Sequence, residues 1–190
     1  GIYSNDIECL CNVLDNCNKI KKFVYMSSSM VYESSERVPF TEELTDEIMP
    51  PKSSYGLTKF IGEKAMKFLN QQHRVNFTIW RPFNAVSPLE PHDREGAHVF
   101  VDFYRRIFIE KQPKIEIYGS GKQGRCFTWV EDIATAIADF LTDPRTDGQV
   151  FNIGSSEPKT MIELRDILIK IGREKSALPQ DYNPKTVTGN

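Results

Sequence analysis

Residues 23–26 (Phe-Val-Tyr-Met) constrain the fold most, because four apolar residues stand in a row without alternating with polar ones. A strand with this pattern is buried on both faces, as in a parallel sheet covered by helices. Three serines follow directly, at positions 27–29. Ligands of open α/β sheets bind beyond the carboxyl ends of the strands, so we expect a binding site at these hydroxyls. A serine-rich turn without a ligand is the alternative.

A second pattern is the pair Tyr55 and Lys59, in a segment that we expect to be helical from about residue 54 to Asn70. Residues four apart on a helix share one face, with about 5–6 Å between their Cβ atoms. A free tyrosine has a pKa of about 10, but a lysine cation beside a tyrosine favours the phenolate. The pair therefore offers a group that exchanges protons near neutral pH. An exposed helix with an unrelated tyrosine and lysine is the alternative, because this spacing is common by chance.

Together, these segments resemble the extended short-chain dehydrogenase/reductase family, the NAD-dependent nucleotide-sugar epimerases and dehydratases. In that family a strand ends in Ser-Ser/Thr-x-x-Val-Tyr-Gly, and Tyr-x-x-x-Lys follows further along the chain. Here residues 27–33 read Ser-Ser-Ser-Met-Val-Tyr-Glu, with Glu33 in place of the glycine. The resemblance implies that Ser28, Tyr55 and Lys59 are the catalytic residues. In this role Tyr55 takes the proton of a sugar hydroxyl, Lys59 binds the cofactor ribose, and Ser28 positions the hydroxyl.

Two later segments extend the resemblance. Residues 81–88 (Arg-Pro-Phe-Asn-Ala-Val-Ser-Pro) are similar to the family's RPFNxxGP, with Ser87 in place of the glycine. Residues 125–132 (Arg-Cys-Phe-Thr-Trp-Val-Glu-Asp) are similar to its R-D-F-T-x-V-x-D, with Cys126 in place of the aspartate.

The resemblance also assigns binding residues. It places four residues at the cofactor: Ser27, Tyr55, Lys59 and Pro82. It places three at the substrate: Ser28, Asn84 and Arg125. An arginine suits a diphosphate because its planar fork can bind phosphate oxygens bidentately. The alternatives are a loop-capping role for Asn84 and a surface salt bridge for Arg125.

We therefore expect an α/β fold, with the later strands of a Rossmann-type parallel sheet and a small α/β substrate-binding portion. Residues 1–88 would form the C-terminal part of the NAD-binding domain and carry the catalytic residues. Residues 89–190 would be mainly the substrate-binding portion, with interleaved returns to the sheet. The family's glycine-rich cofactor loop and first strands have no counterpart in these residues, so we expect a fragment.

Residues 119–124 (Gly-Ser-Gly-Lys-Gln-Gly) match the letters of the dinucleotide-binding fingerprint. That fingerprint needs a helix directly after the glycines, to face the phosphates. Residues 125–130 favour a strand instead. We therefore expect a turn between two strands, in which glycines supply positive φ.

Hydrophobic periodicity predicts the remaining elements. Helices are expected at 6–18, 99–110, 131–142 and 160–172, and Thr160 and Glu163 fit a capping box for the last of them. Further strands are expected at 75–80, 115–118 and 151–153. The tail after Arg173 is polar and contains two prolines, so we expect it to be disordered.

Composition excludes several classes of protein. The net charge of −2 offers no surface for nucleic acid, and no apolar run approaches the roughly 20 residues of a membrane helix. No signal peptide is recognisable, so we expect a cytoplasmic protein with reduced cysteines. The cysteines (Cys9, Cys11, Cys17 and Cys126) and the histidines His92 and His98 lack the spacing of a zinc site, so no metal is expected.

The resemblance also bears on the reaction. In the classical 4,6-dehydratases an aspartate and a glutamate follow the catalytic hydroxyl, whereas Ser29 and Met30 stand there in this chain. Neither can act as acid or base, which favours an epimerase that oxidises a sugar carbon transiently and returns the hydride. We expect NAD as cofactor (NADP is possible), a nucleotide-diphosphate sugar as substrate, and a homodimer. The alternatives are a dehydratase or reductase of the same family, and an inactive fragment or interaction module.

Overall fold

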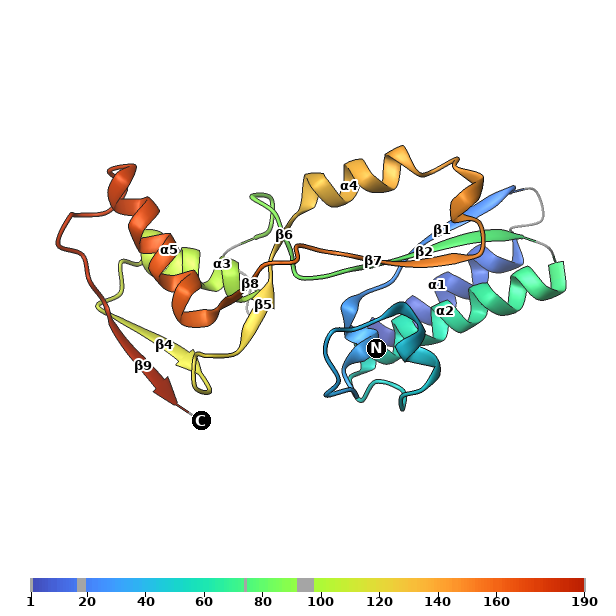
Figure 1. The fold of residues 1–190 in the computed structure, drawn as a ribbon, viewed down its shortest axis with the longest axis horizontal. Helices are drawn as coiled ribbons and strands as arrows, with labels where there is room; N and C mark the ends of the chain where they lie inside the picture. Colours follow the sequence, from blue (N-terminus) through green and yellow to red (C-terminus); the bar gives the residue numbers. More distant parts are fainter. Residues whose placement is uncertain (1, 17–19, 74, 92–97, 190) are drawn as a thin grey trace. The chain divides into compact units, whose positions relative to one another are not determined.

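The structure is a computed structural model of the chain, and it describes residues 2–16, 20–73, 75–91 and 98–189. The chain divides into two compact units (Figure 1). Unit 1 comprises residues 1–83 and 131–154, and unit 2 comprises residues 84–130 and 155–190. Each unit mixes helices with strands, which confirms the expected α/β class.

Unit 1 contains a parallel sheet. Its strands are β1 (Lys22–Met26), β2 (Asn76–Pro82) and β7 (Gln149–Ile153), in the order β1-β2-β7. Met26 at the end of β1 pairs with Trp80 of β2, so the residues that follow these strands lie at the same edge of the sheet. The parallel pairing expected for residues 23–26 is confirmed. The side chains of residues 23–25 are only partly buried and Met26 is exposed, because β1 is the outer strand among the described ones.

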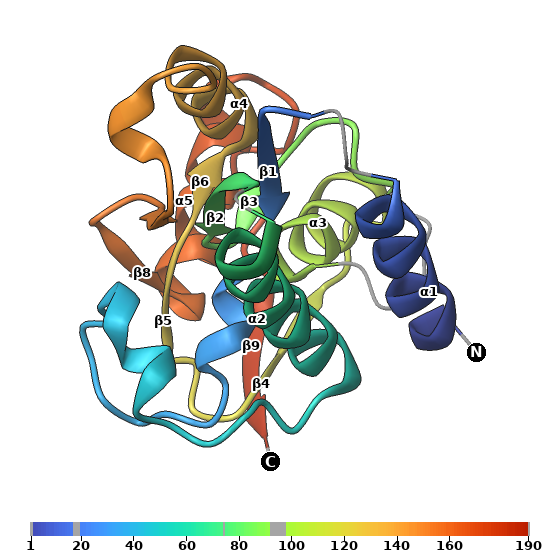
Figure 2. The same cartoon turned by 90° about the vertical axis from the view of Figure 1, so that its right-hand side faces the viewer.

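Helices cover both sides of this sheet. Figures 1 and 2 show α1 (Ile2–Asp15) and α2 (Ser54–His73) on one side and α4 (Val130–Asp139) on the other. The core between α2 and the sheet is built from Met66, Phe77 and Ile79. Since the central strand β2 is buried along most of its length, it holds the sheet in place beneath α2.

The segment between β1 and α2 is polar and contains three prolines, yet it is partly helical. It contains two short 3₁₀ helices, η1 (Ser29–Tyr32) and η2 (Glu42–Asp46). They pack around Val31, Tyr32 and Leu44, and the Tyr32 ring stacks on Phe40 with 4.8 Å between the centroids. Aromatic packing therefore orders this polar segment next to the end of β1.

Unit 2 packs helices against short strand pairs. The helices are α3 (Val99–Tyr104), its π-helical continuation η3 (Arg105–Ile109), and α5 (Met161–Glu174). The strand pairs are β3 (Ala85–Val86) with β6 (Thr128–Trp129), β4 (Lys114–Tyr118) with β9 (Lys185–Gly189), and β5 (Gly124–Cys126) with β8 (Pro158–Thr160). A short 3₁₀ helix, η4 (Pro144–Thr146), belongs to unit 1. The capping box at α5 is confirmed, because Thr160 and Glu163 exchange side-chain and backbone hydrogen bonds.

The prediction of disorder after Arg173 is wrong for residues 185–189. These residues form β9, which pairs in parallel with β4 along its whole length. Polar composition argued against order, but Thr-Val-Thr suits a strand and β4 offers it an edge. The rejection of a dinucleotide fingerprint at residues 119–124 agrees with the structure, because strand β5 follows the glycines and Gly119 and Gly121 have positive φ.

Two structural observations concern the predicted absences. Among the helices in the described ranges, none is long and apolar enough to cross a membrane. Within those same ranges, no three His, Cys, Asp or Glu side chains are grouped so as to hold a metal ion. Cys17 and His92, considered above as ligands, lie outside the described residues.

Candidate active site

The candidate catalytic serine lies directly after the β1 strand. Ser28 has an extended backbone and caps η1, where its Oγ accepts a hydrogen bond from the backbone N–H of Met30 at 3.2 Å. Its side chain is largely buried. The accepted bond orients the hydroxyl, whose own proton is the group that can donate to a ligand.

Tyr55 and Lys59 lie on successive turns at the start of α2. The tyrosine is 45% exposed, so its hydroxyl is accessible to a ligand. Lys59 Nζ donates a hydrogen bond to the backbone carbonyl of Met26 at 3.0 Å, and it lies 5.8 Å from the centre of the Tyr55 ring. The lysine is also 5.7 Å from the centre of the Tyr25 ring. The structure thus brings the Tyr-Lys pair to the end of the strand that carries Ser28.

Two glycines allow α2 to approach this strand end closely. A Cβ at Gly56 would lie 2.8 Å from the Met30 carbonyl oxygen, and a Cβ at Gly62 would lie 2.0 Å from the Tyr25 hydroxyl. Both distances are too short for real side chains. Glycine at these positions therefore lets the helix lie against η1 and β1, which positions Tyr55 and Lys59 next to Ser28.

A buried charge pair that our sequence reasoning did not single out lies beside these residues. Glu63 is 2% exposed and Arg81 is fully buried. Arg81 Nε and Nη2 donate to the two carboxylate oxygens of Glu63 at 2.9 and 2.7 Å. Its other N–H groups donate to the Tyr32 hydroxyl at 2.5 Å, the Glu42 carbonyl at 2.8 Å and the Thr45 hydroxyl at 2.9 Å. Each of the five N–H donors of the guanidinium thus has an acceptor.

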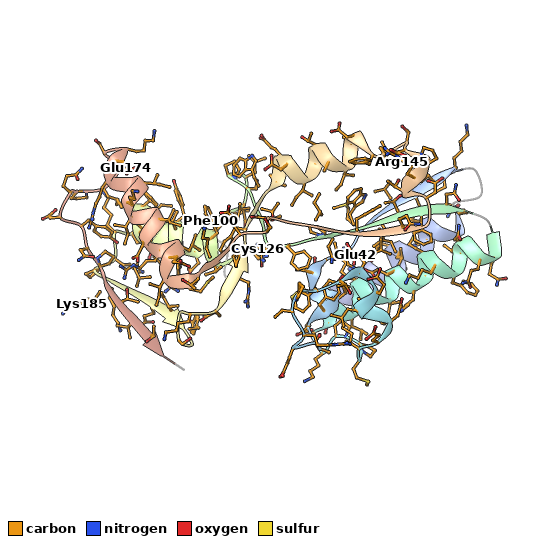
Figure 3. The ribbon with its side chains drawn as sticks, in the orientation of Figure 1. Glu42, Phe100, Cys126, Arg145, Glu174 and Lys185 are labelled. Carbon is orange, nitrogen blue, oxygen red and sulfur yellow. The ribbon has the colours of Figure 1, made fainter. Side chains whose placement is uncertain are left out.

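The electrostatics of this pair favour the charged arginine. Burial by itself lowers the pKa of Arg81, but the hydrogen bonds and charge of Glu63 outweigh it and raise that pKa above its ordinary value. Burial raises the pKa of the Tyr32 phenol, against the opposing charge of Arg81. Tyr32 therefore stays neutral and donates to Asn152 Oδ1 at 2.7 Å, which connects the network to β7. Figure 3 labels Glu42, whose side chain accepts from the Asn152 backbone N–H.

The network also includes Ser27. Its hydroxyl donates to Glu63 Oε1 at 2.5 Å, and its backbone N–H donates to the Trp80 carbonyl at 2.8 Å. The hydroxyl proton and the backbone N–H of Ser27 are thus both used inside the protein. Pro82, which is also expected at the cofactor, is the last residue of β2 and pairs with Ile153. The cofactor roles of both residues stay predictions.

Asn84 and Arg125 belong to unit 2, whereas the Ser-Tyr-Lys residues belong to unit 1. Asn84 has a positive φ of 39°, and its side-chain amide donates to the Cys126 carbonyl at 3.1 Å, which holds its loop against the segment of Arg125. Arg125 is exposed, its Nη1 donates to the Gly124 carbonyl, and among the described residues it has no ion pair. The structure thus brings these two substrate candidates close together, and their binding roles stay predictions.

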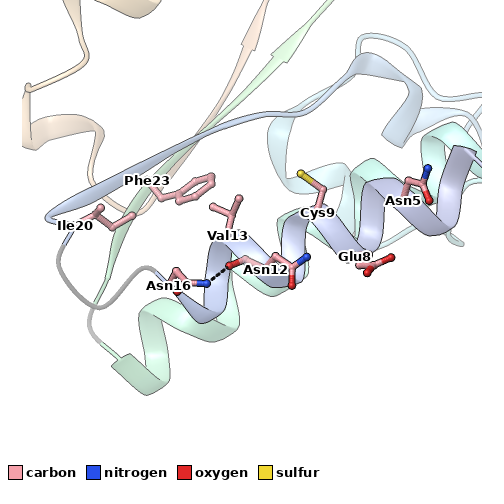
Figure 4. Close-up of a pocket in the computed structure, with 8 residues that line it drawn as sticks. All are labelled: Asn5, Glu8, Cys9, Asn12, Val13, Asn16, Ile20 and Phe23. Atoms are coloured by element: carbon pink, nitrogen blue, oxygen red, sulfur yellow. Dashed lines mark hydrogen bonds between the residues drawn. The ribbon is translucent and has the colours of Figure 1, made fainter.

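Unit 1 also contains a groove that lies away from these residues. It has a volume of about 770 Å³, runs along α1 from Asn5 to Val13, and reaches Ile20 and Phe23 at the start of β1 (Figure 4). Val13, Ile20 and Phe23 supply its apolar wall. None of the candidate catalytic or binding residues lines this groove, and ligands of such sheets bind at the carboxyl ends of the strands. We therefore place the candidate site at Ser28 and not in this groove.

Comparisons with known proteins identify the family and the fold of the chain. The model of the NAD dependent epimerase/dehydratase family matches residues 1–154. The "Uncharacterized UDP-glucose epimerase YtcB" of Bacillus subtilis strain 168 is 30% identical over 178 residues, which cover 92% of this chain and 53% of that protein. The chain spans about half the length of the curated relatives it matches.

Solved structures show the same fold. The UDP-N-acetylglucosamine 4-epimerase of Methanobrevibacter ruminantium M1, in complex with UDP-N-acetylmuramic acid, has a TM-score of 0.80 and 25% identity, over 98% of this chain and 56% of that one. The UDP-glucuronic acid 4-epimerase of Bacillus cereus, in complex with UDP-glucuronic acid and NAD, has a TM-score of 0.76 and 26% identity, over 96% and 54%. Since the family model covers most of its length, this chain belongs to the NAD dependent epimerase/dehydratase family.

Proposed function

We propose that this chain carries the catalytic Ser-Tyr-Lys set and the diphosphate-binding residues of an NAD-dependent nucleotide-sugar epimerase. The observation that carries the proposal is the bond from Lys59 to the Met26 carbonyl, which holds the Tyr55 turn of α2 at the strand end of Ser28. Two hydroxyls and an ammonium gathered at this strand end suit a ligand rich in hydroxyl groups, such as a ribose or a hexose. The names of the relatives reported above support a UDP-sugar as the substrate class.

In the proposed reaction the residues of the chain move a proton and hold the sugar. Tyr55 takes the proton of a sugar hydroxyl, and Ser28 donates a hydrogen bond to the same oxygen. The Lys59 cation stabilises the tyrosine oxygen while it carries the negative charge, before it takes this proton and after it gives the proton back. NAD, when bound, would supply the hydride acceptor and donor for the same carbon. Tyr55 then gives the proton back, which completes the inversion.

Substrate binding is assigned to Asn84 and Arg125. The exposed guanidinium of Arg125 is not neutralised by a carboxylate of the described residues, which leaves its charge for a diphosphate. Asn84 is exposed and holds its own loop through its amide nitrogen, so we assign the contact with the ligand to its side-chain oxygen. For the cofactor we propose Lys59 and Tyr55 at the ribose, with the backbone of Ser27 and Pro82 beside the nicotinamide.

Titration with NADH tests the cofactor part of this proposal. We expect nicotinamide fluorescence to change with a Kd in about the micromolar range. Replacing Lys59 by alanine should weaken binding by about tenfold or more, because it removes the ammonium at the strand end. Lys64→Ala is the matched control, since Lys64 lies on the same helix but pairs with Asp46. Equal binding by the Lys59 and Lys64 variants would contradict the assignment, and no binding at millimolar NADH would show that this chain does not form the cofactor site by itself.

We also propose that two copies of the chain associate through α2. Leu57, Ile61 and Phe68 are exposed and share one face of this helix, and the phenylalanine is 58% exposed. The opposite face, with Gly62, is turned to β1. An apolar stripe of this kind is typical of a helix that packs against a second one.

If two copies associate through this face of α2, a single charged side chain placed on it should separate the dimer. Phe68→Glu is expected to shift the molar mass measured by light scattering from dimer to monomer, because it places a carboxylate in an apolar contact. Leu89→Glu is the control, since Leu89 is even more exposed but lies in unit 2. A monomeric unsubstituted chain, or a Phe68 variant that stays dimeric, would refute this interface.

A further inference from the structure

Glu63 lies on α2, the helix that also carries Tyr55 and Lys59. Positions 55, 59 and 63 are spaced by four, so Tyr55, Lys59 and Glu63 lie along one face of α2. Lys59 binds the carbonyl of Met26, and Glu63 binds the hydroxyl of Ser27. Two successive turns of the helix therefore hold two successive residues of the chain, and the next residue is Ser28.

We propose that Glu63 is a positioning residue, which fixes α2 against the end of β1 and so sets the distance between Ser28 and the Tyr55–Lys59 pair. The inference rests on the proposed function, because it assigns Glu63 a role in the reaction of that same site. Glu63 acts through Ser27 and α2, and the reaction does not use its carboxylate as acid or base.

The carboxylate is suited to this role because its own position is fixed. Oε1 accepts from both Ser27 Oγ and Arg81 Nε, and Oε2 accepts from Arg81 Nη2. Arg81 is in turn held by Tyr32 in η1 and Thr45 in η2. Each of these bonds joins a different element to the buried charge. A shift of α2 relative to Ser27 would therefore break at least one charge-assisted hydrogen bond.

The same sheet offers a comparison at its other end. Lys22 Nζ, near the start of β1, pairs with Asp147 at 2.7 Å and donates to Thr146. The Thr78 hydroxyl donates to the Thr146 carbonyl at 2.9 Å. This cluster joins elements of unit 1 as the Glu63 network does, but it lies away from Ser28 and Tyr55. It therefore supplies variants that lose a buried hydroxyl without touching the site.

The test compares Ser27→Ala with Thr78→Val. Ser27→Ala removes the hydroxyl that links Glu63 to the strand end and leaves the Glu63–Arg81 pair in place. We expect kcat for a UDP-sugar, with NAD present, to fall about tenfold, because small misplacements of catalytic groups cost rate. The KM should stay within about twofold, since the substrate-binding residues are untouched. Thr78→Val should change kcat by less than about twofold, although it also loses a buried hydroxyl.

A second measurement keeps the inference testable without turnover. In the ¹³C-methyl spectrum of methionine-labelled chain, Met26 and Met30 flank the three serines at positions 27–29, whereas Met161 lies in unit 2. Ser27→Ala is expected to shift the Met26 and Met30 signals and leave Met161 unchanged, and Thr78→Val should leave all three in place. If the unsubstituted chain turns over no nucleotide sugar, the proposed function fails, and these spectra still decide the position of α2. Equal losses of kcat in both variants, or unshifted Met26 and Met30 signals in Ser27→Ala, would overturn the positioning role.

Discussion

Replacing Arg81 by methionine is expected to lower the free energy of unfolding of unit 1 by about 3–5 kcal/mol. The change leaves the Glu63 carboxylate uncompensated at a site that is only 2% exposed. It also removes the donors that now satisfy Tyr32 and Thr45. Urea denaturation followed by circular dichroism measures the loss. In a Trp129→Phe background, the fluorescence of Trp80, which precedes Arg81 on β2, reports unit 1 directly.

Two further variants separate the buried pair from surface ion pairs. Arg145→Met removes an exposed arginine that binds Asp143, whose pKa that arginine lowers to about 2, and it should leave the denaturation midpoint nearly unchanged. The double variant Glu63→Leu/Arg81→Met should regain part of the stability that either single change loses, because no charge then stays buried alone. A stable Arg81→Met protein would show that the pair is not buried as described.

Replacing Tyr55 by phenylalanine is expected to remove nearly all turnover of the nucleotide sugar. The ring stays in place above Lys59, but the hydroxyl that exchanges the proton is gone. A positioned acid–base group contributes about 10²–10⁴-fold to rate, so kcat should fall at least about a hundredfold. The measurement is interconversion of UDP-glucose and UDP-galactose with NAD present, with UDP binding followed separately by calorimetry.

The control for this prediction is Tyr118→Phe. Tyr118 is an exposed tyrosine on β4 in unit 2, and losing its hydroxyl should affect neither turnover nor binding. UDP affinity should be the same in both variants, because Tyr55 is assigned to the reacting carbon and not to the diphosphate. Full turnover in Tyr55→Phe would refute the catalytic assignment.

Much of the architecture follows from local patterns in the sequence. The apolar run at residues 23–26 predicts a strand of a parallel sheet, and the structure confirms the pairing with β2. The four-residue spacing of Tyr55 and Lys59 predicts one helix face, which α2 provides. Thr160 and Glu163 predict the start of α5. These predictions succeed because periodicity and capping depend on residues within a few positions of one another.

The family also follows from the sequence, because its motifs are short and contiguous. The family model and the relatives confirm it. The sequence places Ser28 after a strand and Tyr55 in a helix, but it does not say which atoms bind which. Lys59 illustrates the difference: its charge and spacing are visible in the sequence, whereas its bond to the Met26 carbonyl connects residues 33 positions apart.

Only the tertiary structure decided the contacts between distant segments. In the sequence, Glu63 and Arg81 look like ordinary charged residues on a helix and after a strand. In the structure they form a buried ion pair in unit 1. Residues 185–189 are polar, yet they form β9 because β4, about 70 positions earlier, offers an edge to pair with. Composition and periodicity describe what a segment prefers when considered alone. Which partner it meets depends on the register of the sheet and the approach of α2, and these are properties of the folded chain as a whole.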